Sequence, residues 1–174
     1  MSLKIIHTAD WHLGQTFFGY DRDEEHEAFL SWLIDILTLR QTDVLLIAGD
    51  VFDVANPSAA AQRRFFRFLR EANRHNPQLQ IVIIAGNHDS AARLEAPIPL
   101  LEELNTSIVG VVPRTDLCKI DFDSLLIPLY NKEGKREAIC LAVPYLRQGD
   151  YPASKEGKDT YVEGVTRMYR QLYD

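Results

Sequence analysis

Three short apolar segments of the sequence alternate with two longer amphipathic segments. The apolar segments are rich in aliphatic residues and read LKIIHTA (3–9), DVLLIAGD (43–50) and QIVIIAGN (80–87). Between them, residues 25–40 and 57–75 repeat apolar side chains at helical spacing, with Pro57 suited to a first helical turn. Near-continuous apolar strands that alternate with helices are typical of a parallel sheet covered on both faces. The sequence therefore predicts an α/β fold.

The alternation changes after residue 90. A helix is predicted over 92–105, interrupted by Pro97 and Pro99. Short strands that resemble a meander at the start of a second sheet are predicted at 107–112, 118–122, 124–130 and 137–145. A polar loop, 147–159, then leads to a final helix at 160–174.

Composition limits the classes of protein to consider. The 174 residues are 46% hydrophobic and 25% charged, which is typical of one globular domain. The longest apolar runs are far too short to cross a bilayer, so we expect a cytoplasmic protein with no membrane association. Cys118 and Cys140 form neither a metal-spaced pair nor a disulfide framework, which indicates a reducing compartment. A net charge of −6 argues against a broad basic surface for nucleic acid, yet it is compatible with an enzyme that meets phosphate through metal ions.

Polar side chains follow the first three predicted strands at their carboxyl ends. These motifs are Asp10-Trp11-His12, Gly49-Asp50-Val51-Phe52-Asp53 and Gly86-Asn87-His88-Asp89. In open α/β sheets, ligands bind outside the carboxyl ends of the strands. We therefore expect the side chains that follow these strands to lie at one edge of the sheet, namely Asp10, His12, Asp50, Asn87 and His88.

Imidazole, carboxylate and amide donors without a thiolate favour Mn²⁺, Fe²⁺ or Zn²⁺ over a soft metal. Asp50, on the central strand, can bridge two ions, with Asp10 and His12 on one side and Asn87 on the other. Two ions about 3.5–4 Å apart can clamp a phosphodiester and generate hydroxide.

Two residues beside these ligands are predicted to handle protons. His88 follows a ligand and can donate a proton to a leaving oxygen, and Asp53 is placed to orient it. Asp89 is expected to brace the loop. The remaining histidines are expected to have structural roles, His26 and His75 at the surface or at helix caps and His7 in the core.

Together the three motifs resemble the calcineurin-like metallophosphoesterase superfamily, whose pattern is D-x-H, G-D-x-x-D and G-N-H-D/E, then a later H and G-H-x-H. A narrower resemblance to the SbcD/Mre nuclease family comes from HTADWHLGQ (7–15), LLIAGDVFDVANPS (45–58), IAGNHDSAARL (84–94) and VPYLRQGDYP (143–152). It implies a four-layer α/β/β/α sandwich of two mixed sheets, here lacking the later strands. Residues 1–174 would be the amino-terminal part of the nuclease domain, with the DNA-capping and SbcC-binding regions absent.

The resemblance also implies roles for the motif residues. Asp10, His12 and Asp50 would hold a first Mn²⁺, Asp50 and Asn87 a second. His88 would be the catalytic histidine, with Asp53 as its partner.

The implied activity is Mn²⁺-dependent cleavage of DNA in repair and recombination, as a 3′-to-5′ exonuclease on duplex ends and an endonuclease on single strands and hairpins. An SbcC-type ATPase is the implied partner, and family members dimerise through helices that flank the active site. In this chain Phe65, Phe66, Phe68 and Leu69 are candidates for a homodimer interface, with core packing expected for at least half of them.

No histidine follows His88 in this chain, so the later histidines of the family pattern are missing. Because each missing imidazole also removes the groups that orient it, weak Mn²⁺ binding and little or no nuclease activity are expected of residues 1–174 alone. Two alternatives stay open: a phosphoesterase acting on nucleotides or phosphoproteins, and a phosphoesterase fold kept as a binding scaffold. The intact early ligands weigh against the scaffold.

Overall fold

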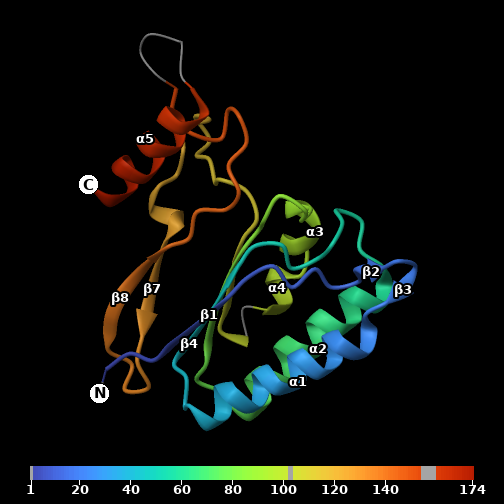
Figure 1. Cartoon of the computed structure of the whole chain (residues 1–174). Helices are drawn as coiled ribbons and strands as arrows, with labels where there is room; N and C mark the ends of the chain where they lie inside the picture. Colours follow the sequence, from blue (N-terminus) through green and yellow to red (C-terminus); the bar gives the residue numbers. More distant parts are fainter. Residues whose placement is uncertain (1, 102–103, 154–159) are drawn as a thin grey trace.

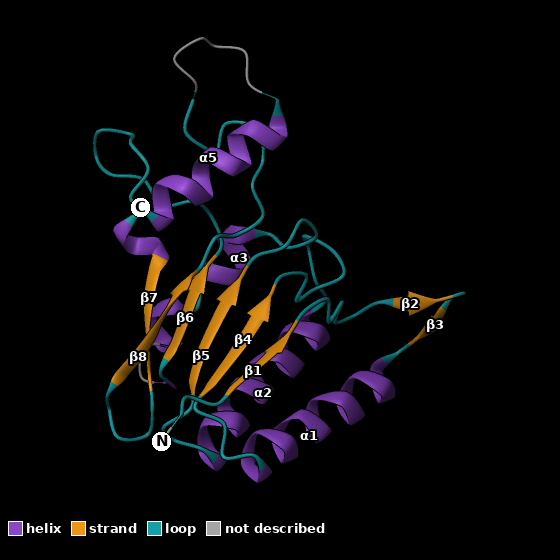
Figure 2. Cartoon of the chain, turned by 60° about the vertical axis from the view of Figure 1, so that its left-hand side comes forward, coloured by secondary structure: helices purple, strands orange, loops and turns teal. Residues whose placement is uncertain are grey.

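A four-stranded parallel sheet forms the centre of the molecule. The computed structural model describes residues 2–101, 104–153 and 160–174. The sheet has the order β1-β4-β5-β6, and all its carboxyl ends point the same way (Figure 2). Its strands are β1 (Ile5–Thr8), β4 (Val44–Ala48), β5 (Gln80–Ile84) and β6 (Thr106–Val109). Each strand is joined to the next in the sheet by a helical connection, as parallel pairing requires. The predicted parallel sheet is confirmed.

Two long helices cover one face of this sheet. Helices α1 (Asp23–Leu39) and α2 (Ala59–His75) run side by side in both views (Figures 1 and 2). Leu45 and Ile47 of β4 alternate in sequence with Val44 and Leu46, and they bury their side chains in the core that includes α1 and α2. Helix α2 begins one residue after Ser58, whose hydroxyl accepts from the Ala61 N–H, so Pro57 precedes the cap and does not lie in the first turn.

Most of the apolar residues of α2 are committed to this core. Phe65 and Leu69 are fully buried and Phe68 is 2% exposed, while Phe66 is half-buried. Phe65 and Phe68 also make edge contacts with the ring of Trp11. Of the four interface candidates on α2, only Phe66 therefore has surface to offer a partner.

The opposite face of the sheet packs against a second, smaller sheet. Strands β7 (Leu126–Tyr130) and β8 (Arg136–Leu141) form an antiparallel pair. A second core joins side chains from both sheets to helix α5 (Tyr161–Tyr173), including Val44, Val82, Leu125, Leu129, Met168 and Leu172. The expected α/β fold is confirmed. Among the described strands, the four-stranded sheet is wholly parallel, and β7 pairs with β8 antiparallel across a five-residue turn, so neither of these two sheets is mixed.

Smaller elements account for the remaining differences from the sequence predictions. The predicted helix 92–105 is split into α3 (Ala91–Glu95) and α4 (Ile98–Leu101), with Pro97 between them. Residues 118–122 are not a strand: this region forms a turn with a single bridge from Arg114 to Ile120, followed by the 3₁₀ turn η2 (Asp123–Leu125). A small hairpin that was not predicted, β2 (Thr16–Phe17) and β3 (Tyr20–Asp21), projects from the loop after β1 (Figure 1). Residues 154–159 of the predicted polar loop lie outside the described residues.

Helix α5 lies beyond the carboxyl ends of β4 and β5 (Figure 2), and its side chains line a cavity together with residues that follow these strands. Its first turn has a capping box, in which Thr160 and Glu163 exchange side-chain and backbone hydrogen bonds. None of the described helices is long and apolar enough to cross a membrane.

Candidate metal centre

The loops after β1 and β4 are held together by main-chain hydrogen bonds that continue beyond the strands. The Asp10 N–H donates to the Gly49 carbonyl at 3.1 Å, and the His12 N–H donates to the Asp50 carbonyl at 3.0 Å. Asp10, His12 and Asp50 all adopt positive φ angles, of 55°, 45° and 48°. Such angles are uncommon outside glycine, and clusters of them occur at functional sites. Three of the four predicted metal ligands therefore share an unusual backbone conformation.

Close backbone contact explains the glycines of two motifs. A Cβ added to Gly86 would lie 2.0 Å from Asp50 Oδ1 and 2.4 Å from the Asp50 nitrogen, and one added to Gly49 would lie 3.0 Å from Gly86 Cα. Asp50 is only 8% exposed. Its carboxylate therefore occupies the space that a side chain at position 86 would need.

Asp89 braces the loops that follow β4 and β5, as the sequence predicts. It is 3% exposed, and its carboxylate accepts from the N–H groups of Gly86 at 2.9 Å, Phe52 at 3.0 Å and Val51 at 3.2 Å. A single buried side chain thus fixes the G-D-x-x-D loop against the G-N-H-D loop.

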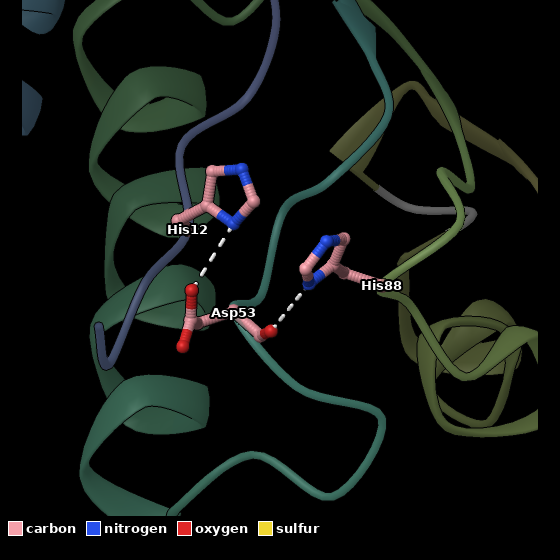
Figure 3. Close-up of side chains that lie close together, drawn as sticks. All are labelled: His12, Asp53 and His88. Atoms are coloured by element: carbon pink, nitrogen blue, oxygen red, sulfur yellow. Dashed lines mark hydrogen bonds and ion pairs between the residues drawn. The ribbon is translucent and has the colours of Figure 1, made fainter. Parts of the chain in front are cut away.

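His12 lies between two carboxylates. Its Nε2 is 3.9 Å from Asp50 Oδ2, and its Nδ1 is 3.2 Å from Asp53 Oδ1 (Figure 3). The second contact is an ion pair by distance, and the Nδ1 atom, which is shielded from solvent, has no aligned hydrogen bond among the described residues. The two ring nitrogens of His12 therefore face different acidic groups.

His88 is oriented by the main chain of Asp53. Its Nδ1 lies 2.7 Å from the Asp53 carbonyl oxygen, so Nδ1–H donates and Nε2 is left without this partner (Figure 3). The His88 N–H donates to Asp50 Oδ1 at 3.0 Å. The hydrogen bond to the Asp53 carbonyl raises the pKa of His88 above its ordinary value, with further support from the charge of Asp50. The carboxylate of Asp53, which was expected to orient His88, faces His12 instead.

Three of the predicted metal ligands line a cavity of about 320 Å³. Asp10, Asp50 and Asn87 line it from the strand ends. Two further segments line the same cavity, residues 143–146 and helix α5, and the strand-end motifs did not predict either of them. Their tyrosines in the lining are Tyr145, Tyr161 and Tyr169. The Tyr145 N–H donates to the Ala85 carbonyl at 2.9 Å, which ties the 143–146 segment to the end of β5. The spacing of four along α5 between Tyr161, Val165 and Tyr169 is a signal for this wall that the sequence contains.

The residues present fit a divalent metal ion. Ligand atoms of Asp10, His12 and Asp50 lie within 4.8 Å of one another, and so do those of His12, Asp53 and His88. All are hard or borderline donors of the type that Mn²⁺, Fe²⁺ and Zn²⁺ accept. The structure thus brings all six predicted site residues to one edge of the sheet, in two overlapping groups with Asn87 beside the first.

Comparison with known proteins agrees with this geometry. Residues 3–160 match the family model for calcineurin-like phosphoesterases. The chain belongs to the calcineurin-like phosphoesterase family. It is 48% identical to the SbcD component of the nuclease SbcCD from Rhodobacter capsulatus, over 98% of this chain and 42% of that protein. It is 33% identical to the SbcD component from Escherichia coli K12, over 98% of this chain and 41% of that protein. The resemblance to the SbcD family is confirmed, and the chain spans about two fifths of the length of these relatives.

The histidines outside the phosphoesterase motifs differ from expectation in two cases. His26, expected at the surface, is 6% exposed, and its Nδ1 has no hydrogen-bond partner among the described residues. Burial, together with the charges of Arg64 and Arg22, lowers the pKa of His26. His7, expected in the core, is exposed because β1 is an edge strand of the sheet. His75 is exposed, as predicted.

Proposed function

We propose that this chain is the amino-terminal part, residues 1–174, of the catalytic domain of a Mn²⁺-dependent DNA nuclease of the SbcD type. The observation that carries the proposal is the convergence of three strand-end motifs on one edge, with His88 held beside Asp50 by its own N–H. Relatives named as the SbcD component of the nuclease SbcCD, which align with 98% of the chain, support DNA as the substrate.

The proposed mechanism assigns one task to each group of residues. Asp10, His12 and Asp50 would hold one ion, with Asp50 and Asn87 contributing to a second. Bound divalent ions supply positive charge that neutralises a phosphodiester and activates water.

His88 performs the proton transfer in this mechanism. Its Nδ1–H is fixed by the Asp53 carbonyl, so Nε2 is the atom that presents a proton to the leaving 3′ or 5′ oxygen. The raised pKa of His88 favours the protonated form that a general acid requires. Because the side chain is exposed, a DNA strand can reach it without a rearrangement of the core.

The proposal extends to activity and partners. We assign the protein 3′-to-5′ exonuclease and single-strand or hairpin endonuclease activity, in DNA repair and recombination in the cytoplasm. An SbcC-type ATPase is the proposed partner, since the relatives are named as components of SbcCD. We also propose a homodimer, to which Phe66 can contribute as the one partly exposed residue of the four α2 candidates.

Hydrolysis of hairpin DNA by the full-length protein, purified with an SbcC-type partner, tests this function. Mn²⁺ should support cleavage, and His88→Ala should reduce the rate at least 100-fold, as loss of a general acid does. His75→Ala, which removes an exposed histidine on α2, is the matched control and should cleave normally. Efficient hydrolysis of a small phosphodiester or a nucleotide with no cleavage of DNA would instead favour the broader phosphoesterase function. Failure to hydrolyse any of these substrates would favour the alternative in which the phosphoesterase fold serves only as a binding scaffold.

A further inference from the structure

We propose that Gln15 and Arg22 are positioning residues for the metal ligand His12, acting through the carboxylate of Asp53. This inference rests on the proposed function in one respect, the role of His12 as a metal ligand. Neither residue belongs to the strand-end motifs. Both lie on the segment that connects β1 to α1.

Gln15 makes the first contact of the chain of polar groups. Its Nε2 donates to Asp53 Oδ1 at 3.3 Å, and this is the same oxygen that lies 3.2 Å from His12 Nδ1. The Gln15 amide and the imidazole therefore share one carboxylate oxygen. The Gln15 N–H also donates to the His12 carbonyl at 2.9 Å, so the turn itself brings the two residues together.

Arg22 holds the other end of the Gln15 amide. Its Nη1 donates to Gln15 Oε1 at 2.8 Å, which fixes the amide with its nitrogen toward Asp53. Arg22 is also the residue that precedes the first turn of α1, and its Nε donates to Glu25 in that turn. The guanidinium thus connects the metal loop to the start of a helix.

The start of α1 is in turn fixed by α2. Arg64 of α2, 7% exposed, pairs with Asp23 at 2.8 Å and with Glu27 at 3.0 Å. These contacts hold the first turn of α1, and with it Arg22, against the main core. Polar contacts therefore link Arg22 to His12 through Gln15 and Asp53, and the main chain links Arg22 to Asp23, which pairs with Arg64.

The Asp53 carboxylate acts on His12 through its charge, because it lies 3.2 Å from Nδ1 without an aligned hydrogen bond. A carboxylate facing Nδ1 favours the tautomer with the proton on that nitrogen, which leaves the Nε2 lone pair directed at the Asp50 side. Groups that orient a ligating histidine in this way typically contribute about 10- to 100-fold to metal affinity. Without Gln15, the Asp53 carboxylate would be free to rotate away from the ring.

The test measures Mn²⁺ binding to the full-length protein in the absence of DNA. Gln15→Met should weaken Mn²⁺ affinity about 10-fold with little change in melting temperature. Gln15→Glu keeps an acceptor for Arg22 but cannot donate to Asp53, and it should show at least the same loss. Gln62→Met is the matched control, because Gln62 also donates one side-chain hydrogen bond, to the Pro57 carbonyl, on a different element. It should bind Mn²⁺ normally.

A double-mutant cycle separates positioning from a general structural role. In an Asp53→Asn background, Gln15→Met should cause no further loss of Mn²⁺ affinity, since the group through which it acts is already changed. The ring ¹⁵N shifts of His12 in the metal-free protein should lose the Nδ1–H pattern in Gln15→Met. Normal affinity in Gln15→Met, or fully additive losses in the cycle, would overturn the inference. DNA cleavage is not part of this readout, so an absence of nuclease activity would contradict the proposed function and leave this result standing.

Discussion

At the scale of single residues, the geometry of the candidate metal centre depends on the absence of a side chain at Gly86. Gly86 places its Cα against the Asp50 carboxylate. Gly86→Ala should therefore displace Asp50, lower the free energy of unfolding by about 2 kcal/mol and greatly weaken Mn²⁺ binding. Urea unfolding and a Mn²⁺ titration of the variant check both effects.

Gly134→Ala is the control for that substitution. Gly134 lies in the β7–β8 turn at φ +73°, with nothing within 4 Å of an added Cβ. Its replacement should cost about 1 kcal/mol through backbone strain alone and leave Mn²⁺ affinity unchanged. Equal losses of metal binding in the two variants would refute the specific contact between Gly86 and Asp50.

The buried His26 makes a prediction about pH. Burial and the neighbouring Arg64 and Arg22 lower its pKa, against the opposing charges of Asp23 and Glu25. The native state therefore binds the proton less readily than the unfolded chain, whose histidine titrates near 6.5. The stability contributed by neutral His26 is complete above about pH 6.5 and is lost as the pH falls through the lower, folded-state pKa.

His26→Gln removes this titration. Unfolding free energies measured from about pH 7.5 to about pH 5 should fall less steeply in the variant than in the parent. An identical slope in the two proteins would show that His26 contributes nothing to acid sensitivity.

The motif residues could be located from sequence because each follows an apolar strand, and parallel strands place their carboxyl ends together. The environments of other residues could not. His7 lies in a strand and His26 in a helix. The periodicity of these elements does not predict whether a neighbouring element covers either side chain. The position of Asp53 was predictable, but its choice between His12 and His88 depends on a loop geometry that spacing does not encode.

At the scale of elements, the apolar period predicted the long helices and the parallel strands to within a few residues. The β2–β3 hairpin was missed because its two-residue strands are too short to show a period of two. The region 118–122 was misread as a strand: Cys118 has a φ of +58°, which turns the chain, and Asp121 accepts from Ser124 to form a further turn.

The cap of α2 makes a prediction at this scale. Ser58 accepts from the Ala61 N–H, and the first turn of α2 contains no acidic residue that would replace this contact. Ser58→Ala should lower the free energy of unfolding by about 1 kcal/mol, whereas Ser58→Asp, which keeps an acceptor and adds a favourable charge, should not. Denaturant unfolding of the two variants provides the comparison.

At the scale of the whole molecule, the sequence predicted the α/β class and the second sheet. The position of α5 at the strand ends was not predictable, because it depends on contacts such as that of the Tyr161 hydroxyl with the Leu146 carbonyl, 15 residues away. The spacing of four between Tyr161, Val165 and Tyr169 marks one face of α5, but it does not say which part of the molecule that face covers.

Metal binding should stabilise the whole molecule. If Mn²⁺ is the proposed metal and binds only the folded state, a concentration about 100 times the dissociation constant should add about 2.7 kcal/mol of stability. Melting temperature should rise with Mn²⁺ in the full-length protein, return with EDTA, and fail to rise in Asp50→Asn. A chain of residues 1–174 should show a smaller rise, since no histidine beyond His88 contributes to its centre. An equal rise in the two proteins would mean that the described residues suffice for the metal.

The contact between His88 and the main chain of Asp53 separates two tasks that fall on one position. A carbonyl group is common to every amino acid, so any residue that preserves the loop can orient His88 from position 53. Only the side-chain carboxylate of Asp53 contacts His12. Under the proposed roles, a change of side chain at position 53 among related proteins would alter metal affinity and leave the orientation of His88 intact.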